Sequence, residues 1–252
     1  MHREPARSPG YRLIRDRNEK GGYRKPGVAE SKERFINFHG IGIAPPGIEK
    51  AELDFWWDAD PFVAALDKVS AAASDYPVLI TFDDGNESDL DIALPALLER
   101  NLTASFFVCA GRVGMRGYLS ASAIRQLLQE GMRIGSHGMH HVDWSKLDDA
   151  QLHTETVDAK RKLEDICGCE ISEASIPFGR YDRRVLKKLK AEGYSRVYTS
   201  GRGIATREAW LKPRNTLDRS WQWKDIPKDL ALQDSYLRRL RTSLSHARKS
   251  VW

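Results

Sequence analysis

The sequence predicts an α/β barrel, in which parallel strands alternate with helices around a closed ring. Segments that favour strands alternate with amphipathic helical segments about seven times, with short connections between them. The run VLITFDDG at residues 78–85 contains an apolar, β-branched stretch that is typical of a strand buried on both faces. No strand is followed by G-x-G-x-x-G or G-x-x-x-x-G-K-[ST], which weakens the alternative of a nucleotide-binding open sheet.

Length and charge indicate one domain with two basic ends. The 252 residues suit a single barrel, which we place at residues 35–229. Residues 1–34 carry ten Lys and Arg against five Asp and Glu, and they predict a flexible basic arm. Residues 230–252 carry five against one and predict an amphipathic C-terminal helix with a basic face. The simpler interpretation is that both ends are solvated. The alternative is peripheral contact with an anionic membrane surface, and no nucleic acid partner is expected.

Cysteine usage and the lack of targeting signals predict a cytoplasmic protein. No apolar stretch approaches about 18 residues, and the N-terminal segment lacks the apolar core of a signal peptide. Three cysteines make an odd count, which argues against a disulfide framework and fits a reducing compartment.

Apolar periodicity and helix-end signals place the elements in order. Asp60 followed by Pro61 predicts a helix start with Asp60 as the N-cap, and Gly193 predicts a helix end. A long amphipathic helix begins near Asp148 or Asp149. We expect strands at residues 35–40, 78–82, 104–108, 132–136, 174–177, 195–199 and 210–213, and helices at residues 60–73, 88–100, 121–130, 147–166, 182–192 and 230–252.

A histidine-rich segment directly follows one of these strands. In GSHGMHH (residues 135–141), His137 and His141 are four residues apart, so both can face one ion if the loop makes one helical turn. Parallel strands of a barrel end at the same mouth, which places these histidines beside the two acids that end the earlier strand. Two histidines and one carboxylate would form the open metal site that hydrolysis requires. Without a metal, the segment would be a polar loop.

The two adjacent aspartates predict a division of labour. If Asp83 and Asp84 both bound the metal, no base would remain to activate water, so one should be a ligand and the other a proton acceptor. Taken alone, Asp-Asp-Gly is a common turn sequence without catalytic meaning. Beside His137 and His141 the catalytic interpretation is favoured.

These motifs resemble those of a known family. TFDDG (residues 81–85) and SHxxxH (residues 136–141) are similar to the first two motifs of the polysaccharide deacetylases, carbohydrate esterase family four. IPFG (residues 176–179) resembles part of the third motif, and the resemblance spans about residues 35–215. It implies a distorted (β/α)7-type barrel that removes acetyl groups from N-acetylated sugars with the help of a metal ion.

The resemblance also implies roles for individual residues. By position, Asp83 is the general base, and Asp84, His137 and His141 bind the metal. The backbone N–H of Phe178 takes the oxyanion-hole role. Six further residues are candidates for contact with the substrate: His39, Trp144, Pro177, Gly179, Arg180 and Arg214. Among them Trp144, three residues after His141, is the tryptophan best placed to stack on a sugar, provided that its ring is exposed.

The sequence departs from the family at three places. Gly138 stands where the family usually has Ser or Thr, and Ser175 stands where it usually has the arginine that holds the base. Arg180 and Arg214 are the nearest replacements by position. The late histidine that acts as general acid has no counterpart. His39, at the end of the first strand, is one substitute, and a structural role for it is the alternative.

We therefore expect a metal-dependent polysaccharide deacetylase whose partner is an acetylated glycan. A His-His-Asp set suits zinc, and cobalt, nickel or manganese would fit the same ligands. Two other functions stay open. One is a C–N hydrolase that acts on a small amide or ureide with the same barrel, and the other is a glycan-binding protein with an impaired site.

Overall fold

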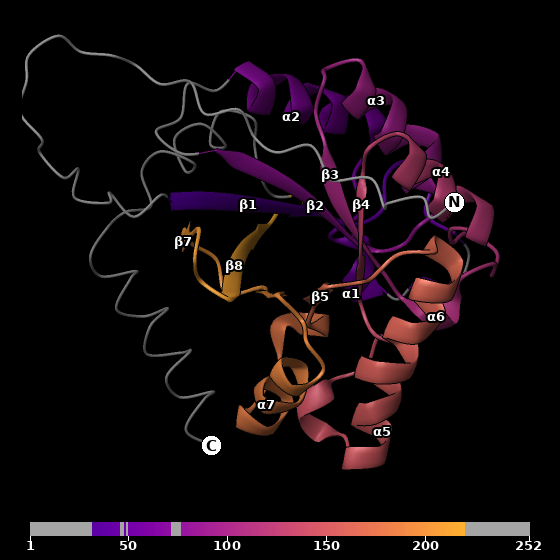
Figure 1. Cartoon of the computed structure of the whole chain (residues 1–252). Coiled ribbons are helices and arrows are strands. Elements are labelled where there is room, and N and C mark those ends of the chain that lie inside the picture. Colours follow the sequence, from indigo (N-terminus) through magenta and orange to yellow (C-terminus); the bar gives the residue numbers. More distant parts are fainter. Residues whose placement is uncertain (1–31, 46–47, 49, 72–76, 220–252) are drawn as a thin grey trace, which may run out of the picture.

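Seven parallel strands form a closed ring in the computed structural model, which describes residues 32–45, 48, 50–71 and 77–219 (Figure 1). Each strand pairs with the next, and the ring closes because β1 pairs with both β2 and β8. The predicted α/β barrel is thereby confirmed. In the order of the ring, the strands are β1 (Lys32–Phe38), β2 (Val78–Asp84), β3 (Ala104–Val108), β4 (Arg133–Ser136), β5 (Glu173–Ser175), β6 (Arg196–Thr199) and β8 (Leu211–Thr216).

Helices connect most successive strands and lie outside the ring (Figure 1). The connection from β6 to β8 differs, because it holds only the two-residue strand β7 (Ala205–Thr206), which pairs antiparallel with β1. No helix of the described part is long and apolar enough to cross a membrane. The α-helices are α1 (Lys50–Leu53), α2 (Ala59–Ala71), α3 (Leu94–Leu98), α4 (Ala121–Gln129), α5 (Asp149–His153), α6 (Ala159–Cys167) and α7 (Arg183–Ala191).

Shorter helical turns lie at the ends of strands and inside longer helices. Two are π-helical turns that continue directly into an α-helix, η1 (Asp89–Ala93) before α3 and η4 (Thr154–Asp158) between α5 and α6. Three are single 3₁₀ turns: η2 (Ala110–Arg112), η3 (Trp144–Lys146) and η5 (Pro177–Gly179).

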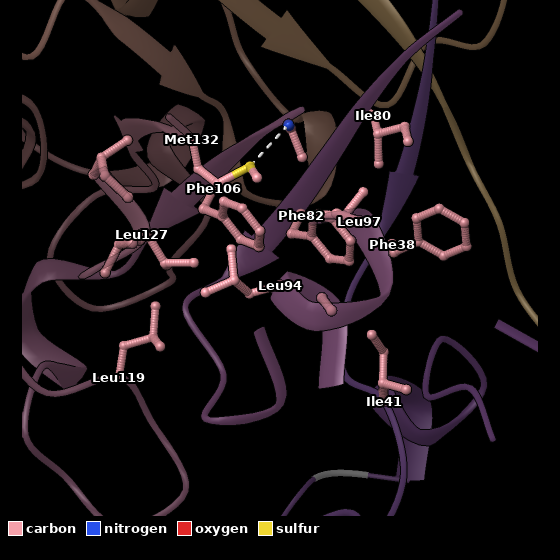
Figure 2. Close-up of a cluster of buried hydrophobic side chains, with 14 of the residues drawn as sticks. Phe38, Ile41, Ile80, Phe82, Leu94, Leu97, Phe106, Leu119, Leu127 and Met132 are labelled. Atoms are coloured by element: carbon pink, nitrogen blue, oxygen red, sulfur yellow. Dashed lines mark hydrogen bonds between the residues drawn. The ribbon is translucent and has the colours of Figure 1, made fainter. Parts of the chain in front are cut away.

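An apolar layer between the strands and the helices holds the barrel together (Figure 2). Phe38, Phe82 and Phe106 are in register on β1, β2 and β3, and their rings stack with centroids 5.6 and 4.7 Å apart. Leu94 and Leu97 from α3 belong to the same cluster. Side chains alternate between the two faces of a strand. Because the Phe82 ring points outward toward the helices, the side chains of Thr81 and Asp83 on either side of it point into the barrel. The core therefore fixes which aspartate of the pair faces the interior.

The boundaries of several elements differ from the prediction. Strand β1 begins at Lys32, three residues earlier than expected, so residues 32–34 belong to the barrel and not to the predicted arm. Helix α2 begins at Ala59, and the Phe62 N–H donates to the Asp58 carbonyl. Asp60 therefore lies inside the first turn, and its prediction as the N-cap is wrong. The N-terminal arm to residue 31 and the predicted helix at residues 230–252 lie outside the described residues.

The long helix predicted at residues 147–166 is present as α5, η4 and α6 in succession. Asp148 is its N-cap, because its side chain accepts from the Gln151 N–H while the Gln151 side chain accepts from the Asp148 N–H. A turn of π-helix in its middle was not predicted.

Candidate active site

Three side chains predicted as metal ligands meet at the carboxyl end of the barrel. Asp84 is the last residue of β2, and His137 directly follows β4. Oδ1 of Asp84 lies 3.4 Å from Nε2 of His141 and 3.7 Å from Nε2 of His137. One ligand atom from each residue lies within 4.8 Å of the other two. A single cation can therefore contact all three.

The backbone orients the ring of His137 for this role. Its Nδ1 lies 2.8 Å from the carbonyl oxygen of Ser175, and because a carbonyl only accepts, Nδ1 carries the proton. Nε2 then keeps its lone pair and faces Asp84, the arrangement usual for a metal-binding histidine. Burial lowers the pKa of His137 to about 4, against the opposing charge of Asp83. The ring is thus neutral at pH 7.

The surroundings of the Asp84 carboxylate indicate whether a cation fits between the three side chains. Its Oδ1 is buried and has no hydrogen-bond partner among the described residues, although buried carboxylate oxygens normally accept hydrogen bonds. The same atom faces two imidazole nitrogens, and the Arg112 guanidinium lies 3.7 Å away. A buried oxygen without a partner beside two nitrogen donors fits a divalent cation that keeps further positions open.

The backbone of the site is strained at three residues. Asp84, His141 and Phe178 adopt positive φ angles of 80°, 56° and 57°, a region that residues other than glycine rarely enter. Each such residue costs on the order of 1 kcal/mol or more and persists only where the surrounding structure enforces it. The strain therefore coincides with the residues that the motifs single out.

Asp83 is held by an arginine from another strand. Arg214 of β8 donates from Nη1 to Oδ1 of Asp83 at 2.8 Å and from Nη2 to Oδ2 at 2.6 Å, a bidentate pair with both side chains buried. Burial alone would raise the pKa of Asp83. The charges of Arg214 and His137 and the hydrogen bonds from Arg214 outweigh burial, and they hold this pKa well below its usual range. Asp83 is therefore ionised at neutral pH.

Other interior side chains complete this pair. Asn37 donates from Nδ2 to Oδ2 of Asp83 at 3.1 Å, and its Oδ1 accepts from Nη1 of Arg214 at 2.7 Å. The hydroxyl of Ser175 accepts from Nη2 of Arg214 at 2.6 Å. Ser175, which stands in place of the usual arginine, thus contacts the guanidinium that holds the base. Arg180, the other candidate for this role, instead lies on the surface and pairs with Asp143 at 3.3 Å.

The turn η5 places Phe178 beside the metal ligands. Its ring is half exposed and lies 4.5 Å, between centroids, from that of His141. The N–H groups of Gly179 and Arg180 donate to the Ile176 and Pro177 carbonyls, so the hydrogen bonds of this turn do not use the Phe178 N–H. Pro177 and Gly179 are buried, which leaves Phe178 and Arg180 as the parts of this turn that a ligand can touch.

His39 lies at the same mouth, one residue after the end of β1. Because Phe38 of β1 pairs with Phe82 of β2, His39 follows β1 at the level at which Asp83 follows Phe82 on the neighbouring strand. Its Nδ1 is buried without a hydrogen-bond partner in the described part of the chain, and its ring packs against Phe55 at 5.2 Å. The ring is therefore next to the site without being one of the three clustered ligands.

Trp144 does not line the mouth, so its prediction as a sugar-stacking residue is wrong. Its side chain is 0% exposed, and its Nε1 donates to Glu155 at 3.3 Å. Three residues of separation from His141 placed it near the site, but the chain turns inward at η3 and packs the indole into a second apolar cluster.

Several residues around the site could not be identified from the sequence. Asn37 reads as part of an apolar strand, and Glu155 as one charge on an amphipathic helix. Glu52 of α1 lies 3.6 Å from Nδ1 of His141, on the side of the ring opposite Asp84. Asp89 is fully buried without a partner for either oxygen among the described residues, and burial and the charge of Asp84 raise its pKa well above the usual range. Only the folded structure brings these groups to the mouth.

The fold and the site together define a class of protein: an α/β barrel in which Asp84, His137 and His141 could hold a metal ion beside the buried carboxylate of Asp83. The family model for polysaccharide deacetylases matches residues 71–197, about half of the chain. The chain belongs to the polysaccharide deacetylase family.

Curated relatives agree with this assignment, and a solved structure agrees with the fold. The chain is 32% identical over 158 residues to a peptidoglycan-N-acetylglucosamine deacetylase of Bacillus cereus (61% of this chain, 60% of the relative). It is 30% identical over 138 residues to a chitooligosaccharide deacetylase of a Bradyrhizobium species (54% and 59%). The matches cover about half of the length of the curated relatives. The deacetylase PplD of Streptococcus pyogenes has the same fold, with a TM-score of 0.69, 21% identity, and coverage of 79% of this chain and 96% of that one.

Proposed function

We propose that this protein is a metal-dependent deacetylase that hydrolyses the amide bond of an N-acetylated saccharide. The observation that carries the proposal is the separation of two adjacent carboxylates. Asp84 turns its free oxygen toward His137 and His141, whereas Asp83 points into the barrel and pairs with Arg214. One strand end thus supplies a ligand and a separate base, the two functions that metal-assisted hydrolysis needs.

The proposed metal site consists of Asp84, His137 and His141. When bound there, a divalent cation would polarise the substrate carbonyl and make water more acidic. Two nitrogen donors and one oxygen donor suit zinc, and cobalt, nickel and manganese are alternatives for the same set.

The chain's own residues divide the remaining steps. Asp83, ionised and fixed by Arg214, accepts a proton from the attacking water. The Phe178 N–H, which the turn η5 does not use, donates to the oxygen on which negative charge develops. The exposed ring of Phe178 offers an apolar face to a sugar, and Arg180 stacks behind it, 5.6 Å from the centroid.

His39 is the proposed general acid for the leaving amine. The register of β1 and β2 places it at the mouth beside Asp83, and the described residues offer its Nδ1 no hydrogen-bond partner. We expect His39→Gln to lower kcat about 10²-fold on an N-acetylated oligosaccharide. The loss should be much smaller on an aryl acetate ester, whose leaving group needs no protonation. Equal losses on both substrates would contradict the role, and His153→Gln, a surface histidine on α5, is the control.

Acetate release tests the function as a whole. Purified protein incubated with chitooligosaccharides, peptidoglycan fragments and O-acetylated glycans should release acetate from the N-acetylated ones. Chelator should stop the reaction, and added Zn²⁺ should restore it. Cyclic amides and ureides, included in the same panel, would identify the alternative C–N hydrolase if they alone were cleaved. A protein that binds glycan but neither holds a metal ion nor cleaves any member of the panel would point to the impaired glycan-binding alternative, and one metal ion per chain would disfavour it.

A further inference from the structure

We propose that Glu155 is a positioning residue that holds the loop between the two metal histidines in its ligand-presenting shape. The inference rests on the metal site proposed above and concerns a residue outside it. Glu155 lies in the π-helical turn η4 with its side chain 3% exposed. A buried carboxylate is costly unless strong hydrogen bonds compensate for the water that it loses.

The hydrogen-bond partners of this carboxylate among the described residues belong to one stretch, residues 139–144. Its Oε2 accepts from the Met139 N–H at 2.8 Å, and its Oε1 accepts from the His140 N–H at 3.1 Å and from the His140 ring Nδ1 at 2.9 Å. The Trp144 indole donates to Oε2 as well. Residues 139 and 140 lie between the ligands His137 and His141, and Trp144 follows them. The carboxylate thus binds the segment that determines how far apart the two ligands stand.

The Glu155 carboxylate forms no ion pair with a lysine or arginine in the described part of the chain. The titratable side chain that it contacts there is the exposed ring of His140. The negative charge is instead compensated by N–H dipoles, two of them consecutive in the backbone, which is an arrangement that favours an anion. The N–H groups of Met139 and His140 in turn need the Glu155 carboxylate, because a buried N–H without an acceptor destabilises the fold.

The π-helical turn is a second observation that points to Glu155. A π-turn admits one extra residue into a helix, costs stability relative to a regular α-helix, and occurs frequently at functional sites. Here the turn covers Thr154–Asp158 and interrupts a helix that the sequence predicted as continuous. The irregularity lies at the residue that reaches the metal loop.

Gly138 fits the same arrangement. Its φ is +80°, and a Cβ added there would lie 2.4 Å from Oε2 of Glu155 and 3.0 Å from the Trp144 ring. The absence of a side chain at this position is therefore what lets the carboxylate approach the Met139 and His140 amides. Gly138, which stands where the resemblance to the family predicts Ser or Thr, therefore leaves the space that the buried Glu155 carboxylate occupies.

Substitution of Glu155 by Gln tests the proposal on metal affinity. Both carboxylate oxygens accept only from N–H donors, so an amide NH₂ in place of either one would face a donor. We expect Glu155→Gln to weaken Zn²⁺ binding by 10–100-fold, the range found for residues that orient metal ligands. The measurement is calorimetric titration of the metal-free protein, under conditions in which circular dichroism shows each variant to be folded.

Two further variants make the result specific. Glu164→Gln, on α6 of the same helical segment, makes the same exchange at a glutamate that accepts from the Ile171 N–H, remote from the loop, and it should leave Zn²⁺ affinity unchanged. Gly138→Ala should weaken Zn²⁺ binding from the other side of the contact, and the Gly138→Ala/Glu155→Gln pair should be less than additive. Gly138→Ala also supplies the test if Glu155→Gln fails to fold.

The possible outcomes separate this inference from the proposed function. Wild-type Zn²⁺ affinity in Glu155→Gln, or in Gly138→Ala where the first variant does not fold, would overturn the inference. Wild-type protein that binds no Zn²⁺ would overturn the metal site and the inference with it. Wild-type protein that binds Zn²⁺ with the expected dependence on Glu155 but releases no acetate would contradict the proposed function alone, and it would support the positioning role.

Discussion

Replacement of Asp83 by Asn should abolish turnover and leave the metal bound. The carboxylate is the proposed proton acceptor, and an amide cannot accept that proton, so we expect kcat to fall by about 10²–10⁴-fold. The three clustered ligand atoms come from Asp84, His137 and His141, and Asp83 is not a member of this cluster; its Oδ2 lies 3.9 Å from Nε2 of His137. Metal content, measured by elemental analysis, should therefore stay at one ion per chain.

His137→Ala is the matched comparison for this experiment, because it removes a ligand from the same buried site. It should lose both metal and activity. Near-normal acetate release by Asp83→Asn from a chitooligosaccharide would show that another group is the base. Metal loss in Asp83→Asn equal to that in His137→Ala would show instead that Asp83 is a ligand, and the division between the two aspartates would be wrong.

Replacement of Arg214 by Met should impair both stability and activity. Removing one partner of a buried ion pair leaves an uncompensated charge, which costs about 3–5 kcal/mol of unfolding free energy. The bidentate contact also fixes the base, so kcat should fall by about 10²-fold even where the variant is folded. Chemical denaturation and acetate release measure the two effects separately.

The pH dependence distinguishes this role of Arg214 from a purely structural one. In the wild type, the folded state lowers the pKa of Asp83 below its unfolded-state value of about 3.9. Ionised Asp83 therefore contributes to the free energy of unfolding at every pH above about 3.9. This contribution is lost only as the pH falls through the lower pKa of the folded state. Without Arg214, burial raises this pKa with less opposition. The acidic limb of kcat/KM should therefore move to higher pH, and the deficit in stability should be largest near neutral pH and shrink below about pH 4.

Lys212→Met is the control for Arg214→Met. Lys212 is also fully buried, lies two residues earlier on the same inward face of β8, and pairs with Glu33 at 3.2 Å, away from the mouth. Its removal should destabilise the barrel comparably without moving the pH profile. If both variants shifted the profile equally, the effect would come from general loosening of the barrel and not from the contact with Asp83.

The clustering of Asp84, His137 and His141 could be predicted from sequence because each lies at the carboxyl end of a predicted strand. Asp83 and Asp84 are adjacent at one strand end, and His137 and His141 follow another, so parallel strands alone bring them to one mouth. The same reasoning gave the barrel, because the alternation of strands and helices is local information. The core register then decided what the sequence left open, namely which aspartate points inward.

The support around the base could not be predicted in this way. Arg180 and Arg214 were equal candidates by position, and only the pairing of β8 with β1 brings Arg214 into the interior. Trp144 was misplaced because closeness in sequence to His141 carries no information on burial. Glu155 lies in a predicted helix that carries several charged residues. The helical pattern does not reveal that a π-helical turn directs the Glu155 carboxylate into the protein.

Two strands from opposite ends of the described chain, β1 and β8, are neighbours in the barrel. They carry Asn37 and Arg214, which hold the base, and His39 directly follows β1. The family match at residues 71–197 contains the base and the three clustered ligands but neither of these strands. The proposed base and metal ligands thus lie within the matched stretch, whereas the residues that hold the base and the proposed acid lie along a seam between β1 and β8. Substitutions along that seam should therefore change the pH profile and the leaving-group preference of the reaction while metal binding stays intact.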